Sequence, residues 1–309
     1  MKGFGRRDFL RLLAASSTGI ALPALSRAQA PPAPIASTPL SKGLWLFTGA
    51  GCNVLVASAA DGLLMVDGGL AGNSGALLAA IARETGVRQV RLLVNTHWHG
   101  DHTGSNETIG QRGGTIVAHP NTRRWLSSRV YREQQDRVYP PRPAEALPVR
   151  TIAGPETLAA GVTRVDVGPL PPAHTNGDLY VFLPEANVLM VGDVLTVGRY
   201  PVMDYSTGGW IGGLIDAATA LLGIADERTR IVPGLGSIQS RTDLQAETEM
   251  LTAVRDRVWT MIREGKGLRE IARETPTREF DAKWGANEAF LESSYVGLVR
   301  HTHELGRVL

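Results

Sequence analysis

This 309-residue sequence is poor in cysteine and aromatic residues and carries no large surplus of either charge. Its single cysteine, Cys52, excludes an internal disulfide, so the fold must rest on a hydrophobic core, in which we expect Cys52 to be a small buried side chain. The 32 basic residues nearly balance the 30 acidic ones. Charge therefore gives no reason to expect nucleic acid or an anionic lipid surface as a partner.

The first thirty residues have the order of segments that is typical of an export signal. Residues 5–11, Gly-Arg-Arg-Asp-Phe-Leu-Arg, resemble a twin-arginine signal. The apolar stretch over residues 12–25 is too short and too rich in Ser and Gly for a stable membrane span. Ala28 and Ala30 are the small residues that a signal peptidase requires. We expect recognition by the twin-arginine export machinery, cleavage after Ala30 and a periplasmic or secreted protein.

The remaining chain divides by composition into three parts. Residues 31–42 are rich in Pro, Ala and Ser and predict a linker, residues 43–240 predict an α/β domain, and residues 241–309 predict a helical C-terminal extension. Short apolar strands cluster in each half of the domain, near residues 44–48, 53–57, 63–66, 89–94, 163–167, 179–183, 188–191 and 230–232. With helices between them, this order favours two sheets packed face to face and flanked by helices.

Four potential metal ligands lie within the six residues 97–102, His-Trp-His-Gly-Asp-His, directly after an expected strand. Imidazoles at positions i and i+2 cannot share one face of a helix. On a tight loop leaving a strand, however, His97, His99, Asp101 and His102 can converge on one or two cations from different sides. The spacing therefore predicts a metal centre.

This histidine segment, taken with Thr96, resembles the signature of the metallo-β-lactamase superfamily. The resemblance implies an αββα four-layer sandwich and extends in order along most of residues 43–240. It includes an Asp-Gly-Gly turn, a His-Thr-x-Gly-Asp segment, a Val-Gly-Asp strand end similar to the glyoxalase II-like branch, and a Val-Pro-Gly-Leu-Gly turn that resembles the family's Pro-Gly-His-Gly. These are residues 67–69, 174–178, 191–193 and 232–236.

The resemblance implies a first metal site formed by His97, His99 and His174. Three imidazoles with an open fourth position match a catalytic zinc, which lowers the pKa of a bound water to about 7. The implied mechanism is attack of zinc-bound hydroxide on the carbonyl of an ester, thioester, lactone or amide, with Asp101 orienting the water or taking its proton. We therefore expect an exported zinc-dependent hydrolase that acts on a small-molecule substrate.

The second metal site implied by the resemblance is incomplete. Asp101 and His102 would form it, and Asp193 would bridge the two metals. Leu235 stands where the family has its last histidine, and its side chain has no lone pair to donate. We expect one firmly bound zinc and a second that is weak or absent. A replacement ligand from His301 and His303 is an unfavoured alternative.

Four residues near the expected pocket are candidates for substrate contact: Trp98, Tyr200, Asp204 and Trp210. Each also has an ordinary alternative in packing or in capping the next helix. Residues 131–148 are polar and then proline-rich, which favours a solvated surface excursion over a lid.

Three other functions stay open. A β-lactamase would suit an exported protein, but at the position of Asp193 the β-lactamase branches usually carry Cys or Ser. His97, His174 and Asp193 also match the two-histidine, one-carboxylate set of a non-haem iron enzyme, as in the superfamily's persulfide dioxygenases. Leu235 is the only hint of a degenerate, non-catalytic binding protein.

Overall fold

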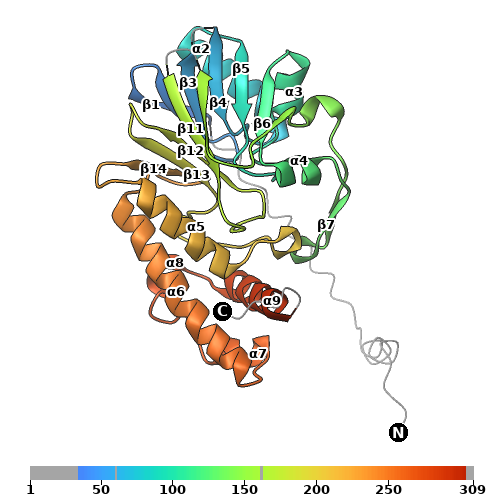
Figure 1. Cartoon of the computed structure of the whole chain (residues 1–309), viewed down its shortest axis with the longest axis vertical. Coiled ribbons are helices and arrows are strands. Elements are labelled where there is room, and N and C mark those ends of the chain that lie inside the picture. The colour runs from blue at the N-terminus through green and yellow to red at the C-terminus, as the bar shows by residue number, and fades with distance from the viewer. Residues whose placement is uncertain (1–33, 60, 161–162, 304–309) are drawn as a thin grey trace, which may run out of the picture. The chain divides into compact units, whose positions relative to one another are not determined.

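Two β-sheets form the centre of the computed structural model, which describes residues 34–59, 61–160 and 163–303 (Figure 1). From edge to edge the first sheet contains β1 (Ala36–Ser41), β2 (Leu44–Thr48), β3 (Val54–Ala59), β4 (Gly62–Val66), β5 (Val90–Val94), β6 (Thr115–Ala118) and β9 (Arg150–Thr151). The second contains β10 (Glu156–Ala160), β11 (Thr163–Pro169), β12 (Leu179–Leu183), β13 (Val188–Gly192) and β14 (Arg230–Pro233). The pairs β4–β5, β5–β6, β6–β9 and β13–β14 are parallel.

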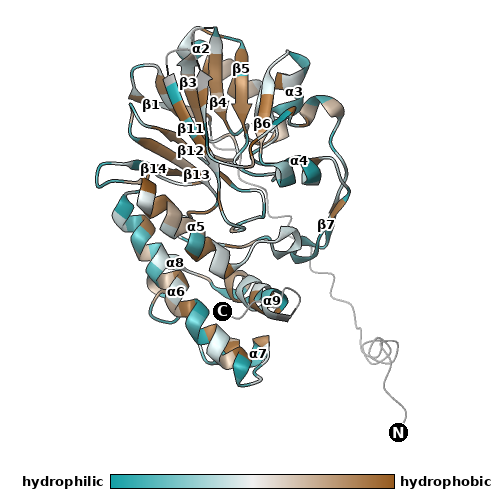
Figure 2. Cartoon of the chain, in the orientation of Figure 1, coloured by the Kyte–Doolittle hydropathy of each residue, from teal (hydrophilic) through white to brown (hydrophobic). Residues whose placement is uncertain are grey.

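The alternation of side chains along each strand explains the layers. In β3, Leu55 packs between the two sheets, whereas its neighbour Val56 faces the helices outside the first sheet. In β13, Met190 faces the first sheet and Val191 faces the helices outside the second. Because both faces of these strands are covered, they are apolar throughout, and Figure 2 shows this as hydrophobic colour along the central strands.

Helices cover both outer faces of the sandwich. Helices α2 (Ser74–Thr85) and α3 (Asn106–Gln111) pack on the first sheet through Leu77, Ile81 and Ile109. Helix α5 (Ile211–Ile224) packs on the second sheet. The αββα sandwich implied by the sequence is confirmed. Shorter helices complete the domain: α4 (Pro120–Leu126) and the single 3-10 turns η1 (Ala71–Asn73), η2 (Glu133–Gln135), η3 (Ala144–Ala146) and η4 (Tyr205–Thr207).

The C-terminal region is helical, as expected, and packs on the second sheet through α5. It contains α6 (Arg241–Arg263), α7 (Leu268–Arg273), α8 (Asp281–Trp284) and α9 (Glu288–His303). Leu251 and Leu291 share one core cluster with Ile231 of β14, and residues Ala33–Leu309 form a single compact unit. Helix α6 begins at a capping box, in which Asp243 N donates to Ser240 Oγ and Ser240 N donates to the Asp243 carboxylate.

Two expectations at the N-terminal side have different outcomes. The predicted linker over residues 31–42 is corrected, because Ala36–Ser41 form the edge strand β1, paired antiparallel with β2. Its Pro39 is compatible with an edge position, where a missing N–H leaves no ladder bond unmade. The predicted export signal, residues 1–30, lies outside the described residues. Within the described part of the chain, no helix has the length and apolar character needed to cross a membrane.

Candidate metal centre

The candidate ligands follow the ends of strands that meet at one edge of the sandwich. His97, His99 and His102 lie on the loop after β5, His174 lies on the loop between β11 and β12, and Asp193 directly follows β13. The two sheets are joined at this point, since Leu179 N donates to Thr96 O at 2.8 Å. The fold thus brings together residues that are up to 96 positions apart in the sequence.

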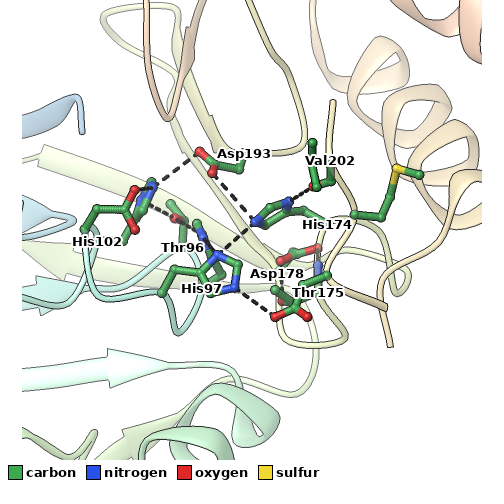
Figure 3. Close-up of polar contacts among 12 residues, drawn as sticks. Thr96, His97, His102, His174, Thr175, Asp178, Asp193 and Val202 are labelled. Carbon is green, nitrogen blue, oxygen red and sulfur yellow. Dashed lines mark hydrogen bonds and ion pairs between the residues drawn. The ribbon is translucent and has the colours of Figure 1, made fainter. Parts of the chain in front are cut away.

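The first group of ligand atoms converges tightly. His97 Nε2 lies 3.1 Å from His99 Nδ1, and His99 Nδ1 lies 3.0 Å from His174 Nε2. The carboxylate of Asp193 comes within 3.6 Å of His174 Nε2, and Figure 3 shows it between His174 and His102. One atom from each of these four residues lies within 4.8 Å of the others. Three imidazole nitrogens and one carboxylate oxygen are donors that suit a divalent transition metal such as zinc.

Each imidazole of this group is held by its other nitrogen. His99 Nε2 lies 2.9 Å from Asp204 Oδ2, and His174 Nδ1 donates to Val202 O at 2.8 Å. His97 Nδ1 lies 3.2 Å from the hydroxyl of Thr96. These contacts place the ring protons on the outer nitrogens, so the converging nitrogens carry lone pairs. The rings are therefore oriented as metal ligands require.

Burial favours the neutral form of these imidazoles. It lowers the pKa of His97 well below its usual value, and the neighbouring imidazoles of His102 and His99 lower it further. Burial also lowers the pKa of His99 to about 4, although the hydrogen bond to Asp204 opposes the shift. Neutral imidazole is the form that binds metal, so both rings are ready to do so at neutral pH.

His102 belongs to a second, differently organised group. Its Nδ1 lies 2.7 Å from Asp67 Oδ2, and its Nε2 faces Asp193 Oδ1 at 3.3 Å and Asp101 Oδ2 at 3.8 Å. Burial alone lowers the pKa of His102, but the Cys52 thiol and the Asp67 and Asp193 carboxylates around the ring together raise it well above its usual value. The groups around His102 thus favour the protonated form of its ring.

Asp67 and Cys52 form the buried floor beneath His102. Asp67 accepts hydrogen bonds from Thr96 N at 2.8 Å and Thr96 Oγ1 at 2.7 Å, and it adopts a positive φ of 62°. Cys52, Asp67 and His102 also place ligand atoms within 4.8 Å of one another, but all three are buried. Because the Asp67 carboxylate already has three hydrogen-bond contacts, to Thr96 N, Thr96 Oγ1 and His102 Nδ1, we interpret this cluster as a support of the histidine loop. The expectation of a buried Cys52 is confirmed.

The turn after β14 approaches the second group without supplying a ligand. A Cβ atom on Gly234 would lie 1.9 Å from Asp193 Oδ1 and 2.9 Å from His102 Cε1, so only glycine fits there. Asn53 holds this turn in place, with its Nδ2 donating to Pro233 O and Gly236 O, both at 2.9 Å. Leu235 itself is 49% exposed and apolar. The second group therefore contains Asp101, His102 and the shared Asp193.

A family model for the metallo-beta-lactamase superfamily matches residues 47–237, more than half of the chain. This protein belongs to the metallo-β-lactamase superfamily. Its fold and its convergent histidines agree with that membership. A comparison with curated proteins finds no match.

Solved structures of the superfamily share the fold of this chain at low sequence identity. A metallo-beta-lactamase from Pontibacter korlensis is 21% identical, with 71% of this chain and 99% of that chain covered and a TM-score of 0.58. The DIM-1 metallo-beta-lactamase is 20% identical, with 71% and 97% covered and a TM-score of 0.56. The inverting sec-alkylsulfatase Pisa1 from Pseudomonas sp. is 16% identical, with 84% and 50% covered and a TM-score of 0.68.

The residues predicted to contact substrate occupy different places in this superfamily member. Trp98 lines a cavity of about 590 Å³ that also borders His99 and Asp101. Tyr200 lines a smaller cavity of about 130 Å³ beside His174 and Asp193. Its hydroxyl is turned away, however, and donates to Asp281 Oδ1 at 2.9 Å.

The other two lie elsewhere. The Asp204 carboxylate is fully buried between His99 Nε2 and Arg132 Nε, at 2.9 and 3.2 Å, so it positions a ligand candidate instead of meeting substrate. Trp210 stacks on His301 with ring centroids 3.6 Å apart, beside a separate cavity of about 310 Å³. The two ligand groups found among the described residues do not include His301.

Sequence reasoning missed the basic wall of the larger cavity. A hairpin formed by β7 (Val130–Arg132) and β8 (Arg137–Tyr139) contributes Arg132 and Arg137, and Arg142 follows it. The available signal was the presence of three arginines within eleven residues. They lie in residues 131–148, for which the sequence favours a solvated surface excursion. The segment instead borders the cavity beside the metal centre.

Proposed function

We propose that this protein is an exported metal-dependent hydrolase of the glyoxalase II-like branch, cleaving an ester, thioester, lactone or amide bond in a small molecule. The observation that carries the proposal is the convergence of three buried imidazoles beside a cavity large enough for such a substrate. A purely structural histidine cluster would not need ring nitrogens aimed at one point with their lone pairs free.

The donor set fits zinc better than iron. A non-haem iron site would use His97, His174 and Asp193 and leave three positions open. Here His99 Nδ1 lies 3.1 Å and 3.0 Å from the other two nitrogens, so an ion held by His97 and His174 would meet this third imidazole as well. Three imidazoles with a fourth position beside the Asp193 carboxylate would suit a catalytic zinc. A zinc ion held there would supply Lewis acidity and a water with a pKa near 7.

The chain's own residues account for the rest of the chemistry. Asp204 and Val202 O keep the rings of His99 and His174 in the ligating tautomer. Asp101 has a side chain 42% exposed at the cavity wall, where its carboxylate can accept a proton from an attacking water. Trp98 closes the wall next to His99 and excludes solvent from that side.

Hydrolysis of a sulfate ester is a second candidate. The similarity to the structure named as a sec-alkylsulfatase covers 84% of this chain. The matched region must therefore include part of the helical extension, residues 241–309. The arginines of the neighbouring cavity also suit a substrate that carries negative charge.

A metal-reconstitution experiment with a substrate screen tests the proposal. The protein is stripped with a chelator, reloaded with zinc or with ferrous iron, and assayed with a lactone, a thioester, nitrocefin and an alkyl sulfate. We expect zinc to restore hydrolysis of at least one of them. Oxygen consumption on glutathione persulfide by the iron form, without hydrolysis by the zinc form, would overturn the proposal in favour of an oxidoreductase. No turnover by either form would favour a binding protein.

A further inference from the structure

The open cavity beside His99 and Asp101 carries mainly positive charge. Arg132, Arg137 and Arg142 all line it, and Asp101 is the only acidic residue of the lining. Like charges gathered around one cavity repel each other, and the repulsion is relieved when an anion enters. The question is therefore which of these guanidinium groups are free to meet a ligand.

Arg132 is largely neutralised within the protein. Its Nε lies 3.2 Å from Asp204 Oδ2, and its guanidinium sits over the ring of Trp98, 5.9 Å from the centroid. Because Asp204 also holds His99, this arginine is part of the support of the metal centre. We therefore leave it out of the ligand-binding set.

Arg137 and Arg142 are different. Within the described part of the chain, the ion pairs formed at 4.0 Å or less include Arg132 but neither of these two. Arg137 is exposed and stacks over Tyr139 at 5.0 Å, and Tyr139 in turn meets Trp98 edge to face at 5.7 Å. This stacking holds the positively charged guanidinium of Arg137 at the cavity wall.

Arg142 reaches the metal loop itself. Its Nη2 would lie 3.3 Å from a Cβ atom on Gly100, the residue between His99 and Asp101. Its backbone is anchored, since Arg142 N donates to Leu126 O at 2.7 Å. The guanidinium is therefore placed next to the position where a substrate bond would meet the metal centre.

Apolar surface shares the cavity with these charges. Leu70, which is 45% exposed, and Trp98 both line it, as does Tyr139, which contacts both Arg137 and Trp98. An arginine fork binds carboxylate, sulfate or phosphate oxygens in a bidentate way, and the apolar wall takes a hydrocarbon body. The arginines and the apolar wall together suit a ligand with one anionic group and a hydrocarbon body.

We propose that Arg137 and Arg142 form an oxyanion-binding subsite, and that the substrates of this protein are small amphiphilic anions whose charged group occupies it. The statement that these anions are substrates rests on the proposed hydrolase function. The binding of the anion does not depend on that assignment, so the two are separable by experiment.

Calorimetric titration, with no turnover involved, tests the subsite. The probes are hexanoate, hexyl sulfate, hexyl phosphate and the uncharged hexan-1-ol, at one fixed ionic strength, against zinc-loaded and zinc-stripped protein. We expect the anions to bind more tightly than hexan-1-ol in both forms, and their rank order to identify the preferred oxyanion. The double variant Arg137→Gln/Arg142→Gln should bind the anions at least about tenfold more weakly.

A matched control removes the same charge elsewhere. Arg123→Gln/Arg124→Gln alters two exposed arginines of α4 that do not line the cavity, and it should leave anion affinity unchanged. Equal weakening in both double variants would reduce the effect to general electrostatics and overturn the subsite. So would anion binding that requires zinc but ignores Arg137 and Arg142. Either result would still be compatible with zinc-dependent hydrolysis of uncharged esters. Conversely, anion binding without any zinc-dependent ester hydrolysis would overturn the proposed hydrolase function and leave the subsite standing.

Discussion

The two halves of the metal centre differ in how far their ligand atoms are prepared for a cation. In the first half, His99 Nδ1 lies 3.1 Å from His97 Nε2 and 3.0 Å from His174 Nε2, and the other nitrogen of each ring is held by a neighbouring group. In the second half, His102 Nε2 is engaged with Asp193 at 3.3 Å, Asp101 lies farther off at 3.8 Å, and Leu235 supplies nothing. The first half has converging ligand atoms for a cation, whereas in the second half His102 pairs with carboxylates.

The protonation states deepen this contrast. The pKa of His99 falls to about 4, so this imidazole can bind a metal at neutral pH without losing a proton. The pKa of His102 is raised, so the binding of a metal through this ring would be coupled to the loss of a proton. We therefore expect the first site to fill before the second.

Removal of a first-half imidazole should have the largest effect. We expect His174→Ala to abolish stoichiometric zinc binding and to reduce hydrolysis by on the order of 10³-fold. Metal analysis after dialysis and the turnover rate measure the two effects. His119→Ala is the control, because His119 only accepts a hydrogen bond from Asn121 N at the start of α4. Full zinc binding by His174→Ala would remove this residue from the site.

Addition of the missing imidazole should change the second half. We expect Leu235→His to raise the bound zinc from about one to about two equivalents, because position 235 follows directly after Gly234, which touches both Asp193 and His102. Leu235→Asn, which is polar but lacks an imidazole, should stay at one. A Leu235→His variant that still binds one equivalent would show that the imidazolium state of His102, and not the absent ligand, limits the second site.

Loss of the carboxylate behind His99 should weaken the first half without destroying it. Asp204→Ala removes the acceptor that fixes the ring, and we expect zinc affinity to fall by about 10–100-fold. Competition with a chromogenic chelator measures this affinity. The exposed Asp216→Ala on α5 is the matched control and should behave as wild type. Unchanged affinity in Asp204→Ala would mean that burial alone orients His99.

The smallest expected effect concerns the loop that carries Asp193. Glu247 of α6 is buried and accepts hydrogen bonds from Thr196, and burial raises its pKa to about 8. A raised pKa of an acid means that the folded state holds the proton more tightly, so this stability is complete below about pH 4.5 and is lost as the pH rises through 8.

Glu247→Gln should therefore melt a few degrees higher than wild type at pH 9 and close to it at pH 4.5. Thermal denaturation at the two pH values tests this. Asp243→Ala would instead lower the melting temperature, because it removes the acceptor for Ser240 N and with it half of the capping box of the same helix. A Glu247→Gln variant that is less stable at pH 9 would show that the charged carboxylate is itself stabilising.

The parts of the fold and site that can be predicted from the sequence are those whose contacting residues lie close together in the chain. The loop at 97–102 is predictable because its ligands are neighbours, and the strands are predictable because apolar runs mark them. The sequence predicts a substrate contact at Asp204, since nothing in the local sequence shows that this carboxylate, 105 positions away, lies behind His99. Strand β1 was missed because its pairing with β2 outweighs a composition typical of linkers.

The arginine wall was missed for a related reason. Three arginines near prolines are usually solvated, and only the return of the β7–β8 hairpin over the histidine loop gives them a shared cavity. Local pattern thus indicates which chemistry is present, and the tertiary contacts decide which residues support it.

The central claim is that the centre contains one complete metal site and one incomplete one. Zinc quantification by mass spectrometry on wild-type protein, after exhaustive dialysis against metal-free buffer at pH 7, tests it most directly. The account predicts one equivalent retained per chain, and none in His97→Ala. Two tightly held equivalents, or none at all in the wild type, would contradict it.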